Sequence, residues 1–321
     1  MLRASQLLSN IRSFKHSNLL PLSSVWPDSR RSAVLILLFI GHNGELRVLL
    51  TRRSKGLRSF SGHVSLPGGK ADNNQETFEE VARREAEEEI GLPRDAEILH
   101  EKFGMKIDHI STQMPCYLSR TFLSVKPLVC FLHNETADGE APLDASRFFG
   151  KLNPGETSSI FSVPLSDMVC HLQPDCKGYE PEYVSRREHM SRWGGLKWPM
   201  RHYYYPVSNH NDVGWLNEIE DTSSADELQE STACRDLWGL TAKILYDLAR
   251  IANDMLSKTD MEWDIGHEEL IYGLHEYGNQ LQGEKRSEWE IGMISGENKL
   301  KYADVIPGYY MKRLRQVASK Y

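Results

Sequence analysis

The stretch REAEEEIGL, residues 84–92, places acidic side chains on the apolar side of a predicted helix. An α-helix turns about 100° per residue, so Glu85, Glu88 and Glu89 project from one face. The apolar residues that this helix must bury share that face; they are Phe78, Val81, Ala82, Ala86 and Ile90. Unpaired carboxylates on an inward face destabilise a fold by several kcal/mol or more. The pattern therefore predicts a cation beside them.

A solvated acidic face is the simpler interpretation of a glutamate-rich helix. The helical positions argue against it, because the other charged residues already occupy the opposite side. These residues are Glu80, Arg83, Arg84 and Glu87. Carboxylate oxygens suit Mg²⁺ or Mn²⁺, and the helix lacks the nitrogen and sulfur ligands typical of zinc. Magnesium usually binds a few carboxylates together with substrate phosphates, so the pattern indicates phosphate chemistry.

Composition limits the class of protein. The chain has 321 residues, 40% of them hydrophobic, and a net charge of −7, which is typical of a soluble globular protein with one large domain or two small ones. Neither the charge nor a basic stripe favours nucleic-acid binding. The longest apolar run, residues 34–41, is too short to span a membrane and predicts a buried strand. Five scattered cysteines without CxxC spacing argue against a disulfide framework or a zinc site and fit a reducing compartment.

Both ends of the chain resemble targeting segments. Residues 1–27 contain no acidic residue and carry Arg3, Arg12 and Lys15 among serines and leucines. This composition is typical of a transit peptide, with a disordered basic leader as the alternative. The ending Ser319-Lys320-Tyr321 differs by one residue from the S-K-L peroxisomal signal. The sequence leaves the peroxisome and the mitochondrion open as compartments.

The segment before the glutamate helix predicts a β-hairpin. Residues 33–40 and 45–51 lie on either side of the turn His42-Asn43-Gly44, and Asn-Gly supplies the positive φ that a tight turn needs. Further strands are predicted at residues 96–103, 127–132 and 202–207.

A turn and two helical segments are predicted after these strands. Asn153-Pro154-Gly155 predicts a turn that leads into a helical segment. Residues 235–251 carry apolar side chains at the spacing of an amphipathic helix. Residues 208–233 are polar and acidic, and we expect a surface insertion there. The expected organisation is a leader at residues 1–27, a main domain at 28–252 and a C-terminal extension at 253–321.

The stretch PGGKADNNQETFEEVARREAEEEIGL, residues 67–92, resembles the Nudix box, G-x5-E-x7-R-E-U-x-E-E-x-G-U with U apolar. The matching residues are Gly69, Arg84, Glu85, Ala86, Glu88, Glu89, Gly91 and Leu92. One extra residue separates Gly69 from Glu76, in the loop before the helix. We expect the metal-binding face to be undisturbed by it and assign no role to Glu76.

The stretch LLTRRSKGLRSFSGHVSLPGG, residues 49–69, resembles the second signature of Nudix enzymes that hydrolyse coenzyme A. The matching residues are Leu49, Leu50, Thr51, Arg53, Ser54, Arg58, Gly62, Pro67, Gly68 and Gly69. Leu66 stands where phenylalanine is usual. Residues 151–165 and 238–252 resemble the middle segment and the closing helix of the same subfamily.

The resemblance implies an α/β fold, a Nudix α/β/α sandwich with a mixed β-sheet, to which we add a C-terminal helical extension. It implies hydrolysis of the pyrophosphate bond of coenzyme A, its disulfide or its acyl forms, to 3′,5′-ADP and 4′-phosphopantetheine, in the peroxisome. The small-molecule substrate is the only partner implied. A Nudix enzyme that removes oxidised nucleoside triphosphates is the alternative activity. An inactive nucleotide-binding module would be expected to lack a box glutamate, and none is missing.

The resemblance also implies roles for single residues. Glu85, Glu88 and Glu89 would bind Mg²⁺ or Mn²⁺, and Arg84 would orient a glutamate through a charge-assisted hydrogen bond. Two glycines, Gly68 and Gly69, would allow close backbone approach, with the Gly69 carbonyl near the metal. Two arginines, Arg53 and Arg58, would bind substrate phosphates, with structural salt bridges as the alternative. We expect Glu156 to be a helix-capping or surface residue and His63 to be structural.

Overall fold

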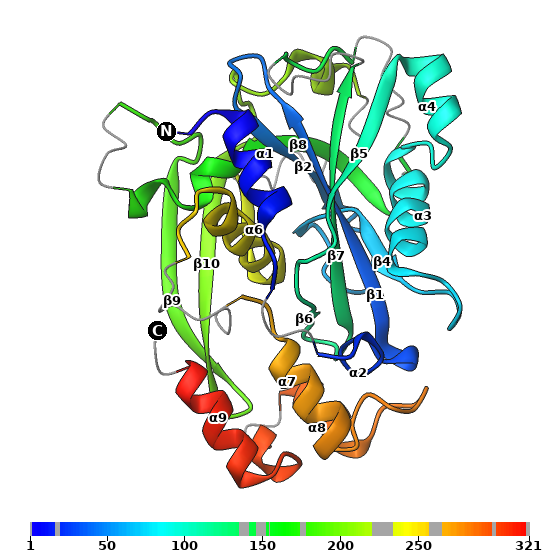
Figure 1. The fold of residues 1–321 in the computed structure, drawn as a ribbon, viewed down its shortest axis with the longest axis vertical. Helices are drawn as coiled ribbons and strands as arrows, with labels where there is room; N and C mark the ends of the chain where they lie inside the picture. The colour runs from blue at the N-terminus through cyan, green and yellow to red at the C-terminus, as the bar shows by residue number, and fades with distance from the viewer. Residues whose placement is uncertain are drawn as a thin grey trace.

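The computed structural model describes residues 2–16, 20–134, 141–145, 152–153, 155–173, 178–219, 234–256, 265–296 and 300–318. Helices cover both faces of a mixed eight-stranded sheet, and a separate three-stranded sheet lies outside one helical layer (Figure 1). The predicted α/β/α sandwich with a mixed sheet is confirmed.

The main sheet is built around the predicted hairpin. Its strands are β1 (Arg31–Ile40), β2 (Leu46–Arg53), β3 (Val64–Ser65), β4 (Gly68–Lys70), β5 (Met105–Ser111), β6 (Tyr117–Leu118), β7 (Ser124–Asn134) and β8 (Thr157–Pro164). β1 pairs antiparallel with β2 and β4 and parallel with β7. Gly44 in the hairpin turn has φ +79°, as the Asn-Gly pair predicts. The strand predicted at residues 127–132 lies within β7.

β1 is buried on both faces. Leu35, Leu37 and Phe39 pack in the cluster that contains helix α3 (Phe78–Ile90). The alternate residues Ile36, Leu38 and Ile40 pack in the cluster of helices α1 (Ala4–Ser13) and α6 (Gly239–Ala252). A strand alternates its side chains with a period of two, so its continuous apolar sequence requires a helical layer on each face.

Helix α3 begins and ends where its sequence dictates. Thr77 and Glu80 form a capping box, in which each side chain accepts a hydrogen bond from the other's backbone N–H. Gly91 ends the helix in the left-handed conformation, with φ +72°. The glutamates at residues 85–89 are therefore held in a helix whose register is fixed at both ends.

Two secondary-structure predictions are wrong. The strand predicted at residues 96–103 is helix α4 (Ala96–Phe103), because Asp95 accepts hydrogen bonds from the backbone of Glu97 and Ile98 and Gly104 terminates the helix. The helical segment predicted after Gly155 is strand β8, which pairs with β2 along its whole length. All of β8 is buried, so tertiary pairing decides its conformation.

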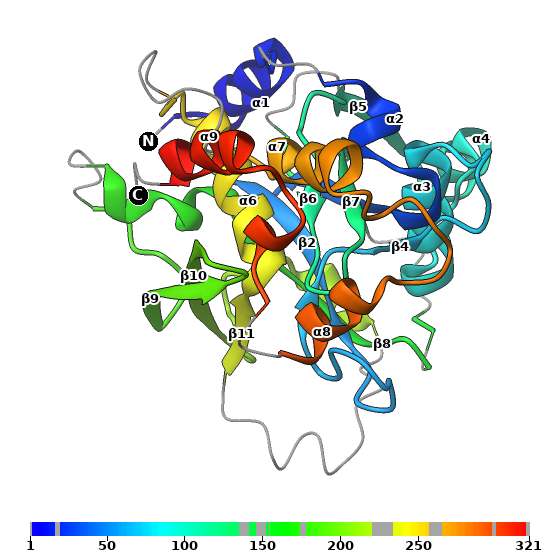
Figure 2. The same ribbon diagram turned by 90° about the horizontal axis from the view of Figure 1, so that it is seen from below.

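The three-stranded sheet contains β9 (Ser185–Trp193), β10 (Leu196–Pro206) and β11 (Cys234–Trp238), with β10 in the centre. Helix α6 lies between it and the main sheet (Figure 2). The strand predicted at residues 202–207 lies in β10, except for its last residue. The helix predicted from residue 235 begins only at Gly239, because the preceding residues pair with β10. In the predicted insertion, Gly214–Glu218 form a 3-10 turn and residues 220–233 lie outside the described part.

The N-terminal segment is part of the fold. Helix α1 buries Ala4, Leu7, Leu8 and Ile11 in the cluster formed with α6. The Asn10 side-chain amide donates a 2.7 Å hydrogen bond to the Ala252 carbonyl at the end of α6. The alternative of a disordered leader is therefore wrong for residues 4–13. Helix α2 (Leu22–Val25) and a 3-10 turn (Asp28–Arg30) connect α1 to β1.

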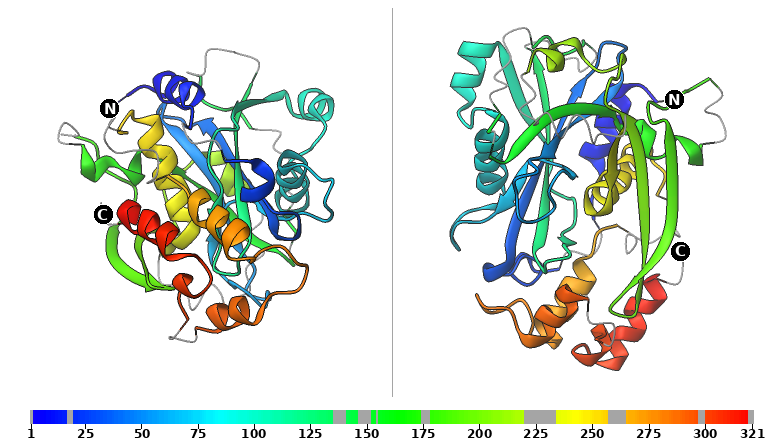
Figure 3. Two further views of the ribbon diagram at one scale, coloured as in Figure 1. Left: turned by 60° about the horizontal axis from the view of Figure 1, so that its bottom comes forward. Right: turned by 180° about the vertical axis from the view of Figure 1, so that it is seen from behind.

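The C-terminal extension is helical, as predicted. It contains α7 (Glu268–Tyr272), a π-helical turn (Gly273–Tyr277), α8 (Glu288–Ser295), a 3-10 turn (Tyr302–Asp304) and α9 (Gly308–Ala318). These elements lie at one end of the sandwich (Figure 3) and contribute side chains to the cluster of β1 and α3. A buried ion pair of 3.1 Å joins Arg30 and Glu290. The boundaries at residues 27 and 252 stay predictions, and packing contacts cross both.

The described cysteines are free thiols: Cys116, Cys130, Cys170 and Cys234. Within the described ranges, no helix combines the length and apolarity that crossing a bilayer requires. The ending Ser319-Lys320-Tyr321 lies outside the described residues.

We expect Leu8→Ala to destabilise the protein. Leu8 is 2% exposed, and truncating a buried leucine removes about 2–5 kcal/mol through lost burial and a residual cavity. Leu2→Ala is the matched control, since Leu2 is 40% exposed. Urea unfolding of both variants measures the difference. Equal stability of the two would contradict the packing of α1 on α6.

Candidate metal and diphosphate site

Two glycines bring β4 against β1 and α3. A side chain at Gly68 would place its Cβ 2.4 Å from the Ala33 carbonyl oxygen, and one at Gly69 would place it 2.3 Å from the Glu85 carboxylate. The neighbour of Gly68 is backbone, so that position has no room for a larger residue, whereas at Gly69 the Glu85 carboxylate would have to move. The Gly69 carbonyl accepts a 2.6 Å hydrogen bond from the Ser32 hydroxyl.

Glu89 is the most buried carboxylate of the α3 face. It is 5% exposed, and its Oε2 accepts a 3.3 Å hydrogen bond from the Gly68 backbone N–H. Burial, with a smaller effect of the nearby Glu85 charge, raises the pKa of Glu89 to about 8, while Arg53 opposes the shift. A carboxyl group in this environment favours a bound proton or a bound cation.

The other two glutamates differ in environment. Glu85 is largely buried, which raises its pKa, and Arg84 Nη1 donates a 2.9 Å hydrogen bond to its Oε1. The Glu88 side chain is 51% exposed, with Arg84 Nη1 3.3 Å from its Oε2. The prediction that all three carboxylates face inward is therefore wrong for Glu88, because only Glu85 and Glu89 point towards the glycines of β4.

Arg84 is held by a residue to which the sequence analysis gave no role. Its Nε donates a 2.8 Å hydrogen bond to Glu76 Oε1, and its Nη2 lies 3.3 Å from Glu76 Oε2. Glu76 also accepts a 2.8 Å hydrogen bond from the Asp72 backbone. These bonds raise the pKa of Arg84 and fix its guanidinium between Glu76 and Glu85. The Nudix box has a glutamate separated by five residues from its first glycine, and this glutamate could have identified Glu76. The extra residue between Gly69 and Glu76 shifts the spacing and hides the match.

A third carboxylate acts electrostatically on the buried pair. The charge of Glu156 raises the pKa of both Glu85 and Glu89. Glu156 precedes β8 and is not in a helix cap, and its carbonyl accepts a 2.8 Å hydrogen bond from Ser54 N–H. The expectation of a helix-capping role is wrong.

The donor set suits a hard divalent ion. The carboxylates of Glu85 and Glu89 lie where burial disfavours negative charge, and oxygen ligands are those that Mg²⁺ and Mn²⁺ prefer. Within the described residues, no three His, Cys, Asp or Glu side chains converge as a finished metal centre. Arg84, bonded to Glu85, supplies part of the neutralising charge.

The two predicted phosphate-binding arginines are placed differently. Arg53 ends β2, and its charge lowers the pKa of Glu89. Its Nε is buried and has no hydrogen-bond partner within the described part of the chain. Arg58 is exposed on the loop between β2 and β3, and no described contact joins it to the glutamates.

The sequence matches the family model of the NUDIX domain over residues 29–184. Peroxisomal coenzyme A diphosphatase 1 of Saccharomyces cerevisiae is 58% identical, in an alignment that covers 99% of this chain and 97% of the relative. This chain belongs to the Nudix hydrolase family. Nudix hydrolase 15, mitochondrial, of Arabidopsis thaliana is 32% identical, over 58% of this chain and 54% of that relative. A crystal structure of the MutT protein from Methanosarcina mazei Go1 is 25% identical over 43% of this chain and 78% of that one, with a TM-score of 0.28.

Membership of the Nudix family accounts for the acidic face of α3. Nudix hydrolases use divalent metal ions, and the buried carboxylates of this Nudix hydrolase are oxygen donors of the kind that such ions prefer. The use of divalent metal ions in this family agrees with the cation that the inward-facing glutamates predict.

We expect the metal-free protein to lose stability as pH rises. Between the ordinary pKa near 4.5 and the folded pKa of about 8, Glu89 keeps a proton that the unfolded chain releases. Stability therefore falls through this window, by up to about 1.4 kcal/mol per pH unit. Glu89→Gln cannot titrate, so in EDTA its stability relative to wild type should rise by about 2–4 kcal/mol between pH 5 and pH 8.

Urea unfolding at both pH values measures this difference. Glu87→Gln is the matched control, because Glu87 lies on the outer side of the same helix and pairs with Arg94. Parallel pH profiles of the unfolding free energy for wild type and Glu89→Gln would contradict the raised pKa of Glu89.

Proposed function

We propose that this Nudix hydrolase cleaves the pyrophosphate bond of coenzyme A and its derivatives, including the oxidised disulfide. Water attacks one phosphorus atom and the bridging P–O bond breaks. The products are 3′,5′-ADP and 4′-phosphopantetheine or its derivative. The observation that carries the proposal is the near full-length, 58% identity to a relative named as a coenzyme A diphosphatase, in a chain that retains every box glutamate.

We assign the metal site to Glu85, Glu88 and Glu89, with Mg²⁺ or Mn²⁺ as the ion. Glu85 and Glu89 provide buried oxygen donors, and Glu88 provides an exposed one at the rim. A divalent ion bound there supplies charge neutralisation to the oxygens of the pyrophosphate. Glu156 adds negative charge to the same place.

The remaining residues position the reactants. Arg84, fixed by Glu76, orients the Glu85 carboxylate. Gly68 and Gly69 give the substrate access to the backbone beside these carboxylates. Arg53, whose charge lowers the pKa of Glu89, is assigned to the pyrophosphate of the substrate, which a guanidinium can bind in a bidentate manner. Arg58, farther out on the loop, is assigned to the 3′-phosphate.

We propose the peroxisome as the location, with the mitochondrion as the alternative. The support is the relative named as peroxisomal, which is similar over almost the whole chain. The folded N-terminal segment buries its apolar face, so an import receptor would have to bind that face before α1 packs against the rest of the protein.

We expect Glu89→Gln to reduce kcat for coenzyme A by two or more orders of magnitude. The change removes the charge of a proposed metal ligand and keeps its volume, so transition-state stabilisation is lost rather than packing. Glu87→Gln on the same helix should retain wild-type kcat, since Glu87 faces outward. Steady-state kinetics at saturating Mg²⁺ measure both. Near wild-type turnover by Glu89→Gln would exclude the assignment.

Alanine variants of Arg53 and Arg58 should differ in their kinetics with coenzyme A and its 3′-dephospho form. Arg53→Ala should lower kcat/KM equally for coenzyme A and 3′-dephospho-coenzyme A, because both contain the pyrophosphate. Arg58→Ala should raise KM for coenzyme A roughly tenfold and leave that for the dephospho form unchanged. The reverse pattern would exchange the two roles.

Substrate choice is tested on wild-type enzyme by comparing kcat/KM for coenzyme A and for 8-oxo-dGTP. A larger value for 8-oxo-dGTP would replace the proposed activity with removal of oxidised nucleotides.

A further inference from the structure

A continuous series of aromatic rings runs from the loop after β2 onto the three-stranded sheet. Phe60 contacts His63 with ring centroids 5.7 Å apart, and His63 contacts Trp238 at 5.2 Å. Trp238 stacks on His202 at 5.4 Å with an interplanar angle of 5°, and His202 stacks on Tyr204 at 6.1 Å. We call these five residues the aromatic row.

The members of the aromatic row that belong to the three-stranded sheet lie on the face that turns away from α6. Along β10, Tyr203 and Tyr205 are buried and their hydroxyls donate to Met168 and Asp167. His202, Tyr204 and their cross-strand neighbours take the other face, because side chains alternate along a strand. Those side chains are partly exposed.

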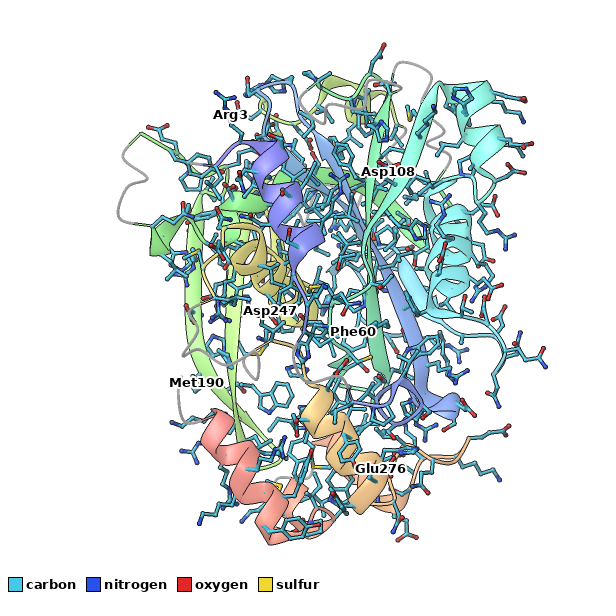
Figure 4. All side chains as sticks on the ribbon, viewed as in Figure 1. Arg3, Phe60, Asp108, Met190, Asp247 and Glu276 are labelled. Atoms are coloured by element: carbon cyan, nitrogen blue, oxygen red, sulfur yellow. The ribbon has the colours of Figure 1, made fainter. Side chains whose placement is uncertain are left out.

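Phe60 is the exposed end of the row. Phe60 is 45% exposed, and its φ of +53° lies in the left-handed region, which is uncommon for a bulky non-glycine residue. Figure 4 labels it among the side chains of the fold. The loop holds this conformation through hydrogen bonds, among them one of 2.7 Å from Ser61 Oγ to the Lys55 carbonyl. A phenylalanine that stays nearly half exposed in this uncommon conformation indicates a binding role.

The row is continuous with the candidate site. The Arg53 backbone N–H donates a 2.9 Å hydrogen bond to the His63 carbonyl, and the Arg53 charge lowers the pKa of Glu89. His63 therefore lies directly opposite Arg53, the residue assigned to the pyrophosphate. Burial lowers the pKa of His63, Asp236 opposes the shift and Arg53 assists it, so its ring is mainly uncharged at neutral pH. An uncharged ring can stack on a neutral base.

We propose that Phe60, His63 and Trp238 form the stacking site for the adenine of the substrate. This inference rests on the proposed function, since coenzyme A carries its adenine a few bonds from the pyrophosphate that Arg53 would bind. A purine presents a flat π-surface to aromatic rings, whereas the pantetheine arm is flexible and has no ring to stack. The aromatic row therefore selects the nucleotide half of the substrate.

Sheet stabilisation by itself explains only part of the row. Cross-strand aromatic pairs stabilise antiparallel sheets, and this accounts for Trp238 against His202. It does not account for Phe60, which belongs to neither sheet and remains exposed.

Equilibrium binding to the full-length protein tests the proposal. The two ligands are adenosine 3′,5′-bisphosphate and a base-free analogue, the methyl riboside 3,5-bisphosphate, which keeps both phosphates. Wild type should bind the adenine-containing ligand roughly 5- to 100-fold more tightly, as expected for base stacking on aromatic side chains. Phe60→Ala and Trp238→Leu should each lower this ratio of affinities to near one, and Phe60→Tyr should keep the wild-type ratio.

Tyr309→Ala is the matched control, because Tyr309 is an exposed aromatic residue on α9 and is 67% exposed. It should keep the wild-type ratio. Phe60 is a surface residue, so its variant remains informative if Trp238→Leu fails to fold. A wild-type ratio in Phe60→Ala, or equal binding of the two ligands by wild type, would overturn the stacking site. Failure of the proposed function is seen separately, as wild type that does not cleave coenzyme A.

Discussion

The contact between α3 and the glycines of β4 is the constraint on which the site depends. Gly68 and Gly69 let the β4 backbone lie directly against β1 and the carboxylate of Glu85. This close approach buries Glu89 and raises its pKa to about 8. The apolar residues of α3, from Val81 to Ile90, hold the helix in place, so the burial energy of the core maintains charged groups in an environment that they would otherwise avoid.

Both ends of the chain complete the same core. Helix α1 packs with α6 on one face of the main sheet, and the C-terminal helices add Leu270, Ile271 and Tyr302 to the cluster of the other face. The NUDIX match ends at residue 184, whereas similarity to the yeast relative covers 99% of the chain. The elements after residue 184, including the three-stranded sheet and α6, thus belong to the structural unit that carries the site.

Part of the fold and site could be predicted from local sequence. The Asn-Gly hairpin, the helix from Thr77 and the glycine positions each depend on conformational rules that act over a few residues. Residues 96–103 were predicted wrongly although their signals are also local, since Asp95 caps the helix, Gly104 ends it and most of the residues between favour a helix. Glu88 shows a limit, since a helical wheel gives direction around the helix but not the width of the neighbouring surface.

The sequence by itself determined the family, the acidic helix face and the chemistry of the donors, because these depend on residue type and spacing along one element. Tertiary structure alone decided which groups meet. It paired Arg84 with Glu76 and brought Gly68 N–H within 3.3 Å of the Glu89 carboxylate. It also brought His63 against Trp238, which are far apart in sequence. Such contacts arise from how strands pair across the sheets and how α6 packs between them, which no local pattern records.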